Sequence, residues 1–147
     1  MANTVTWTST GSYTALVTSS QLSGLSTVQG AIGSAVTGNT FQYAIFELQH
    51  NTTGALTAGD YFSVYLLSAA DGTNYEDGST TVTPARAADV IIPLRGVTNA
   101  SQRVAIANVT LPPGAFKPLI YNISSTSVST ATSVLSYTPY NDQIQTV

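Results

Sequence analysis

The sequence predicts an all-β protein built as a single domain. Apolar and polar residues alternate with a period of two through much of the chain, as in strands that bury one face. Tyr, Val, Ile, Thr and Phe fill these runs, and these residue types favour the pleated surface of a sheet. Clusters of Gly, Asn, Asp, Ser and Pro separate the runs at short intervals, which is typical of a β-sandwich or a β-barrel.

The runs indicate about eight strands within one domain, residues 1–147. Residues 4–18 read as one half-buried strand or a strand pair with a break near Gly11, and residues 1–20 are either this first strand or an N-terminal arm. Two runs are nearly all apolar, as expected of strands buried on both faces. They are residues 61–69 and 88–94. The remaining alternating runs are residues 41–48, 102–111 (with Val104, Ile106 and Asn108 on one face), 116–124 and 132–140.

Residues 25–36 carry the best helical pattern of the chain. Glycines within and around this segment each weaken a helix by about 1 kcal/mol relative to Ala, so we expect a long irregular connection with at most one helical turn. Proline cannot donate a ladder hydrogen bond, so prolines in strand-like runs are expected at sheet edges, bulges or strand ends. They are Pro84, Pro93, Pro118 and Pro139.

Charge is scarce in this chain. Asp, Glu, Lys and Arg make up 7% of the 147 residues and the net charge is -3, whereas a soluble domain usually carries about 25% charged residues. The four basic residues are spread out, so we expect neither nucleic acid nor a membrane surface as a partner. Polarity comes from Ser and Thr, roughly a quarter of the chain. Such a weakly charged surface suits a protein held inside a large assembly.

No catalytic, cofactor-binding or metal-binding residue is predicted, and we do not expect an enzyme. The chain has no cysteine and one histidine, which argues against a thiolate or histidine metal site. His50 follows a strand-like run and opens a polar loop, so we expect it to be solvated and not a catalytic base. The sequence contains no nucleophile elbow, phosphate loop or dinucleotide fingerprint, and nothing in it pairs two carboxylates across a sugar cleft.

Asp71–Gly78, DGTNYEDG, holds three of the seven acidic residues. Its spacing does not match an EF-hand, because a tyrosine and a glutamate stand at loop positions five and six. Asp71–Gly72 and Asp77–Gly78 are turn dipeptides, Asn74 can cap its own backbone, and Tyr75 can fold back over the loop. We therefore expect two consecutive turns, with an irregular calcium site as the open alternative. A second hard turn is expected at Pro112, Pro113 and Gly114.

Three segments resemble small virion structural proteins of tailed bacteriophages. They are YFSVYLLSAADGTNYEDG, LPPGAFKPLIYNISS and SVLSYTPYNDQ, which occur in the same order and spacing as in that family. The resemblance covers roughly residues 41–143. The resemblance implies an antiparallel β-sandwich of jelly-roll type. It also implies a capsid decoration or cement protein on the outer surface of the head, which binds the major capsid protein and stabilises the shell.

The resemblance further implies self-association, with a trimer favoured, around a symmetry axis of the shell. Val5, Trp7 and Tyr13 are the candidate contacts to the capsid or to another copy, because exposed aromatic residues anchor interfaces and terminal segments reach neighbours. A place in the strand core is an equal alternative for Trp7. A tail or fibre module that binds host-surface glycan is the alternative function, since tyrosine-rich strands can stack on sugars. A hydrolase is the weakest alternative.

Overall fold

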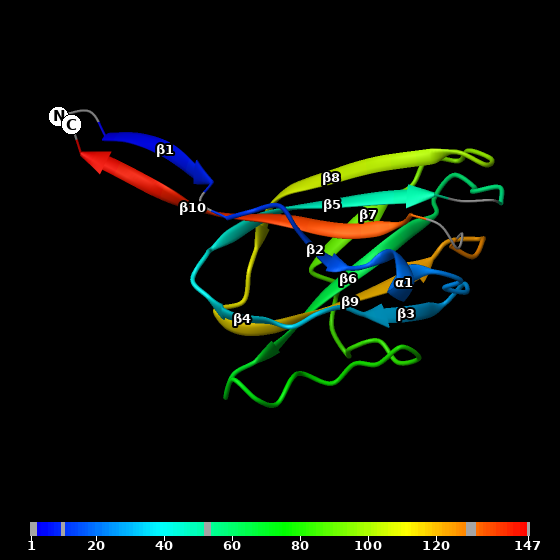
Figure 1. The fold of residues 1–147 in the computed structure, drawn as a ribbon, viewed down its shortest axis with the longest axis horizontal. Helices are drawn as coiled ribbons and strands as arrows, with labels where there is room; N and C mark the ends of the chain where they lie inside the picture. Colours follow the sequence, from blue (N-terminus) through cyan, green and yellow to red (C-terminus); the bar gives the residue numbers. More distant parts are fainter. Residues whose placement is uncertain (1–2, 10, 52–53, 129–131, 147) are drawn as a thin grey trace.

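A computed structural model shows two antiparallel sheets of five strands each, packed face to face (Figure 1). It describes residues 3–9, 11–51, 54–128 and 132–146, with the backbone alone for residues 3–9 and 143–146. Sheet A contains β1 (Asn3–Ser9), β2 (Thr14–Val17), β5 (Tyr43–Asn51), β8 (Ser101–Thr110) and β10 (Val134–Thr146). Sheet B contains β3 (Gln29–Ile32), β4 (Val36–Asn39), β6 (Tyr61–Ala69), β7 (Val90–Pro93) and β9 (Gly114–Ile123). One short helix, α1 (Ser19–Leu22), follows β2.

The strand order is that of a jelly roll. β2 pairs with β10, β3 and β4 with β9, β5 with β8, and β6 with β7. The chain therefore pairs as one long antiparallel hairpin that is wrapped over two sheets, which confirms the predicted sandwich and its jelly-roll type. The described residues form ten strands and not eight, because one position of the roll is split into β3 and β4 and because β1 precedes the roll.

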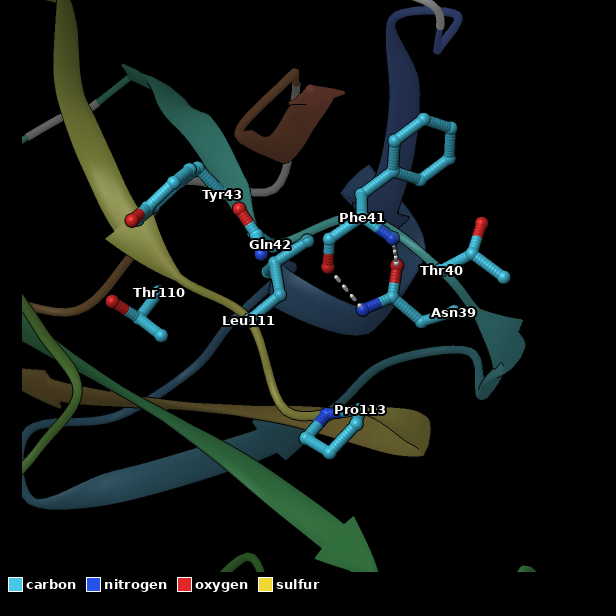
Figure 2. A pocket seen from close by; sticks show the side chains of 8 residues that line it. All are labelled: Asn39, Thr40, Phe41, Gln42, Tyr43, Thr110, Leu111 and Pro113. Carbon is cyan, nitrogen blue, oxygen red and sulfur yellow. Dashed lines mark hydrogen bonds between the residues drawn. The ribbon is translucent and has the colours of Figure 1, made fainter. Parts of the chain in front are cut away.

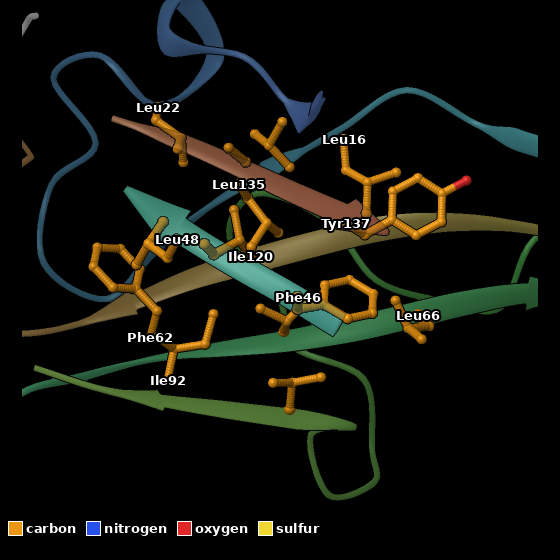
Figure 3. Packing of buried hydrophobic residues seen from close by; sticks show 14 of the residues in the cluster. Leu16, Leu22, Phe46, Leu48, Phe62, Leu66, Ile92, Ile120, Leu135 and Tyr137 are labelled. Carbon is orange, nitrogen blue, oxygen red and sulfur yellow. The ribbon is translucent and has the colours of Figure 1, made fainter. Parts of the chain in front are cut away.

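The main core lies between the two sheets (Figure 3). In strands such as β5, buried residues alternate with more exposed ones, and burying each inward apolar side chain contributes about 1.5–3 kcal/mol to folding. Figure 3 labels members from both sheets and from α1: Leu16, Leu22, Phe46, Leu48, Phe62, Leu66, Ile92, Ile120, Leu135 and Tyr137.

A second, smaller cluster covers the outer face of sheet B. It is formed by Tyr65 and Leu67 of β6 together with Leu119 and Tyr121 of β9, and Tyr75 from the connection between β6 and β7 packs against it. β6 therefore has buried side chains on both of its faces, as its nearly continuous apolar run predicts.

The expectation of an irregular connection at residues 25–36 is wrong for part of the segment. β3 occupies residues 29–32 and β4 begins at Val36, and both pair with β9; residues 25–28 and 33–35 lie outside strands, and the single helical turn lies earlier, in α1. Glycine is needed at Gly30 because a Cβ there would lie 2.5 Å from the Tyr121 ring, and at Gly33 because a Cβ would lie 2.2 Å from the Leu16 carbonyl oxygen. Gly30 and Gly33 are therefore positions where strands and sheets approach closely, whereas Gly24 and Gly38 lie in open space and have positive φ angles of 70° and 64°.

Two prolines lie inside long strands and face breaks in the neighbouring strand. Pro118 of β9 stands where β3 has ended and β4 has not begun, and its carbonyl accepts a hydrogen bond from Gly33 N at 2.8 Å. Pro139 of β10 lies beside Gly11, between the segments that pair with β2 and β1. Both are interior strand positions and not edges or strand ends, although they do mark irregularities. Pro93 ends the edge strand β7, and Pro84 lies in the connection that precedes it.

Two strand expectations need correction. Residues 88–94 are not buried on both faces, because β7 is an edge strand and Ile91 is 49% exposed. The alternation of residues 102–111 does not continue to Asn108, which has a positive φ of 60° and lies at a register shift between β5 and β8. The extra residue moves Val109 to the buried face, as a β-bulge does.

Candidate functional site

The two ends of the chain pair with each other in a terminal arm, which consists of β1 and residues 140–146 of β10. The register runs from Asn3 opposite Thr146 to Ser9 opposite Tyr140. β5 pairs with β10 only as far as Tyr140, so beyond that residue β1 is the one described strand beside β10. Figure 1 shows this ribbon leaving the sandwich, with both termini at its tip. A two-stranded ribbon has marginal stability in water, and both of its edges carry free backbone groups.

The root of the arm is tied firmly to sheet A. Gln42 N donates to Asn141 Oδ1 at 2.7 Å, and Asn141 Nδ2 donates to the Thr40 carbonyl at 3.4 Å. The rings of Tyr43 and Tyr140 stack with 5.8 Å between their centroids, and Tyr140 donates to Asn108 Oδ1 at 2.5 Å. These contacts set the direction in which the arm leaves the sandwich.

A shallow hollow of about 370 Å³ adjoins the root (Figure 2). Thr40 and Gln42, which hold Asn141, are also part of its lining. Asn39 shapes the rim, because its side chain donates to the Phe41 and Pro112 carbonyls at 2.9 Å each. The remaining lining residues are Phe41, Tyr43, Thr110, Leu111 and Pro113. The arm and this hollow form one continuous candidate contact region.

The predicted contact residues lie on or beside the arm. Val5 stands opposite Ile144 and Trp7 opposite Asp142, and their side chains fall outside the described part of the structure, as does the core alternative for Trp7. Tyr13 lies between β1 and β2 and is 59% exposed. It donates to Glu47 Oε1 at 2.7 Å, so its ring is held at the surface of sheet A.

The segment Asp71–Gly78 begins with a tight turn that Asp71 organises. Asp71 Oδ1 accepts hydrogen bonds from Thr73 N at 2.9 Å and Asn74 N at 2.7 Å, and Oδ2 accepts from Asn74 Nδ2 at 2.6 Å. These bonds lower the pKa of Asp71 to about 2. Gly72 has a φ of +75°, a conformation that glycine adopts without strain.

The second half of the segment packs against the outer face of sheet B. The Lys117 ammonium lies 4.0 Å from the centre of the Tyr75 ring. A Cβ on Gly78 would lie 3.1 Å from Leu119 and 3.2 Å from Leu67, so close packing is its role. Asp77, which lies between Tyr75 and Gly78 in the chain, is exposed at a bend. The segment is thus one turn followed by a packed stretch, and not two equivalent turns.

Arg86 holds this connection in place, a role that the sequence pattern did not predict. Its guanidinium binds both Glu76 oxygens, at 2.6 and 3.0 Å, and donates to Asp89 Oδ2 at 2.8 Å and to the Leu66 carbonyl at 3.1 Å. The hydrogen bond from Arg86 lowers the pKa of Glu76. The signal was available, because four charged residues fall within the 14 positions 76–89 of a chain that has few. Within the described residues, no three His, Asp or Glu side chains gather where they could hold a metal ion.

The turn at Pro112, Pro113 and Gly114 connects β8 to β9 beside the hollow. Gly114 has a φ of +81° and opens β9, and Pro113 lines the hollow. The Leu111 amide donates to the Gln42 carbonyl at 2.8 Å, which ties the turn to the start of β5.

The expectation that His50 is solvated is wrong. It lies in β5 with 1% exposure, and its ring meets the Phe62 ring in a T-shaped arrangement with 5.2 Å between centroids. Burial lowers its pKa to about 4. The missed signal is the alternation Ala44, Phe46, Leu48, His50, which puts His50 on the inward face.

His50 and Ser133 form a buried pair. Ser133 Oγ lies 3.3 Å from His50 Nδ1 and also accepts from Asn51 N at 3.0 Å. Both side chains are inside the sandwich, at 1% and 2% exposure, so a substrate cannot reach the hydroxyl in this conformation. The pair joins the end of β5 to the start of β10.

No family model matches the chain, and neither a curated protein nor a solved structure matches it. The described residues contain no helix with the length and hydrophobicity that a membrane crossing requires.

Proposed function

We propose that this protein is a non-enzymatic structural protein of a tailed-bacteriophage virion, a decoration protein on the outer surface of the head. It binds the major capsid protein and stabilises the assembled shell. The resemblance of three sequence segments to this class supports the proposal, and so does a chain with 7% charged residues, which suits a protein held in an assembly.

The observation that carries the proposal is the terminal arm. Its backbone edges are open beyond Tyr140, and an open edge can take up a strand from another protein. A neighbouring chain that pairs with the arm would bury groups that water otherwise solvates, and the hollow at the root extends the contact. Val5 and Trp7 lie in β1 and are the side chains we expect to reach the partner.

Stabilisation follows from mass action. A protein that binds the assembled shell and not its separated subunits shifts the equilibrium toward the shell. Binding at symmetric points of the lattice also brings copies of the protein together, and we expect a trimer around a three-fold axis.

To test the proposal, the gene is deleted and the resulting heads are exposed to heat and to a chelator. Heads without the protein should release their DNA at a lower temperature than wild-type heads, and added protein should restore them. A chain that lacks residues 1–10 should fail to restore them. Equal survival of heads with and without the protein would count against a cement role. Labelling of the protein on the tail instead of the head would favour the alternative of a tail or fibre module.

A further inference from the structure

A groove of about 380 Å³ lies on the outer face of sheet B, away from the core between the sheets. Ser63 lines it, a small residue between Tyr61 and Tyr65 on the same face of β6. Ser63 pairs with Tyr121 of β9 on one side and with Ile91 of β7 on the other. The hollow exists because a serine stands where its neighbours carry large side chains.

Two hydroxyl groups at this groove have no partner within the described structure. Tyr121 is 2% exposed and its Oη makes no hydrogen bond. Its ring lies over Gly30, where a Cβ would be 2.5 Å away, so the ring is held in place. Ser63 is 4% exposed, and no side-chain hydrogen bond joins it to a described residue. A buried hydroxyl without a partner lowers stability, so the Tyr121 hydroxyl favours a ligand that hydrogen-bonds to it.

The lining is neutral throughout, with both aromatic and hydroxyl groups. Thr81 and Thr83 add hydroxyls along one side, and Val28 and Ile123 add apolar surface. None of the residues that line the groove is charged. The nearest guanidinium, of Arg86, lies over the Tyr65 ring at 5.9 Å and is bound to Glu76 and Asp89.

We propose that this groove binds a neutral saccharide. A sugar ring presents C–H groups that stack on tyrosine and hydroxyls that both donate and accept hydrogen bonds, which matches the lining. A charged ligand would find no counter-charge there, and a purely apolar one would leave the Ser63 and Tyr121 hydroxyls unsatisfied. The volume lies within the usual range of small-molecule sites, about 300–1,000 Å³, and accommodates a mono- or disaccharide.

The experiment is a titration of the full-length, isotope-labelled protein with maltose, cellobiose and lactose, followed by NMR. Weak binding, with a Kd on the order of millimolar, should shift the amide signals of Tyr61, Ser63, Tyr65 and Tyr121 for at least one sugar. Failure of all three sugars to shift these signals overturns the proposal. Shifts that depend on protein concentration and not on sugar would assign the groove to a second copy, and also overturn it.

Two variants with matched controls sharpen the test. Tyr121→Phe removes only the unpartnered hydroxyl, so it should weaken sugar binding at least tenfold while the sugar-free protein melts at the same or a higher temperature. Tyr61→Ala should also abolish the shifts. Tyr13→Phe and Tyr13→Ala, which change an exposed tyrosine of the opposite sheet, should leave binding unchanged. A lower melting temperature with unchanged binding in Tyr121→Phe would show that the hydroxyl is structural.

The groove and the terminal arm are separate features, so the two proposals can fail independently. A chain without residues 1–10 should keep its sugar-dependent shifts even if it no longer binds capsids. Loss of the shifts in that chain would contradict a site confined to sheet B.

Discussion

His50 is a buried base that makes the fold sensitive to acid. Its pKa is about 4 in the folded chain and 6.5 in the unfolded chain, so the unfolded state binds more protons between these values. Stability is therefore complete above pH 6.5 and is lost as the pH falls toward 4. We expect the free energy of unfolding to drop by about 2 kcal/mol between pH 7.5 and pH 5, measured by urea denaturation.

His50→Leu is the control for this prediction, because His50 is the one histidine of the chain. The variant removes the titrating group and should have a flatter stability profile over the same pH range. An unchanged slope in the variant would show that another group controls the response. The exposed Asp71 does not interfere, because its pKa of about 2 places its titration below this window.

At the scale of elements, Gly33 is where the two sheets approach through backbone contact. Its amide donates to Pro118 of β9, and the next amide, Ser34 N, donates to the Leu16 carbonyl of β2 at 3.0 Å. Because a Cβ at Gly33 would meet Leu16, Val17 and Pro118 at 2.2–2.8 Å, we expect Gly33→Ala to lower the free energy of unfolding by about 3 kcal/mol.

Gly24→Ala is the comparison for Gly33→Ala. Gly24 has open space around it but a φ of +70°, so alanine there should cost only about 1–2 kcal/mol from backbone strain. Thermal and urea denaturation of both variants would measure the difference. A loss of unfolding free energy at Gly33 no larger than that at Gly24 would mean that β2 and β9 can move apart at Gly33 without destabilising the fold.

Arg86 holds the long connection between β6 and β7 against sheet B. Arg86→Ala removes its bonds to Glu76, Asp89 and the Leu66 carbonyl, and we expect a loss of about 2 kcal/mol and faster proteolysis within residues 71–89. Arg103→Ala is the matched control, since Arg103 is 64% exposed and lies 3.6 Å from Glu47. It should change stability by less than about 0.5 kcal/mol. Equal effects would refute a special role for Arg86.

At the scale of the whole molecule, we expect the jelly roll to fold without the terminal arm. The inner half of β10 is flanked by β2 and β5, and the described side chains of the core between the sheets come from strands other than β1. We expect a chain without residues 1–10 to keep its far-ultraviolet circular dichroism and to melt within a few degrees of the full chain. Light scattering should find the full chain as a trimer and the shortened chain as a monomer. A shortened chain that still forms trimers would assign self-association to another surface.

Much of the fold could be predicted from local pattern, and the misses have physical causes. Period-two alternation identified most strands because one face of each is buried. It failed at residues 25–36, where glycines serve close packing against Tyr121 and Leu16, which a linear pattern does not reveal. It failed at Asn108 because a bulge shifts the phase of the strand by one residue. At His50 the pattern was correct, and the polar residue type obscured it.

The candidate site was only partly predictable. Residues 1–20 were identified as a first strand or an arm, but the choice depends on strand length at the other end of the chain. β10 has 13 residues and β5 has 9, so β10 extends beyond its partner and β1 pairs with the excess. The saccharide groove had no sequence signal, because Ser63 forms a hollow only when Tyr61, Tyr65 and Tyr121 surround it.

The sequence by itself determined the all-β class, the scarcity of charge and the turn chemistry of Asp71 and Pro112–Gly114, because each follows from residue type and local spacing. Only the tertiary structure decided which strand lies beside which, where prolines can stand inside strands, and that the two ends of the chain meet in an arm. These features depend on pairing between residues far apart in the chain, and burial and register, not local preference, select the partner.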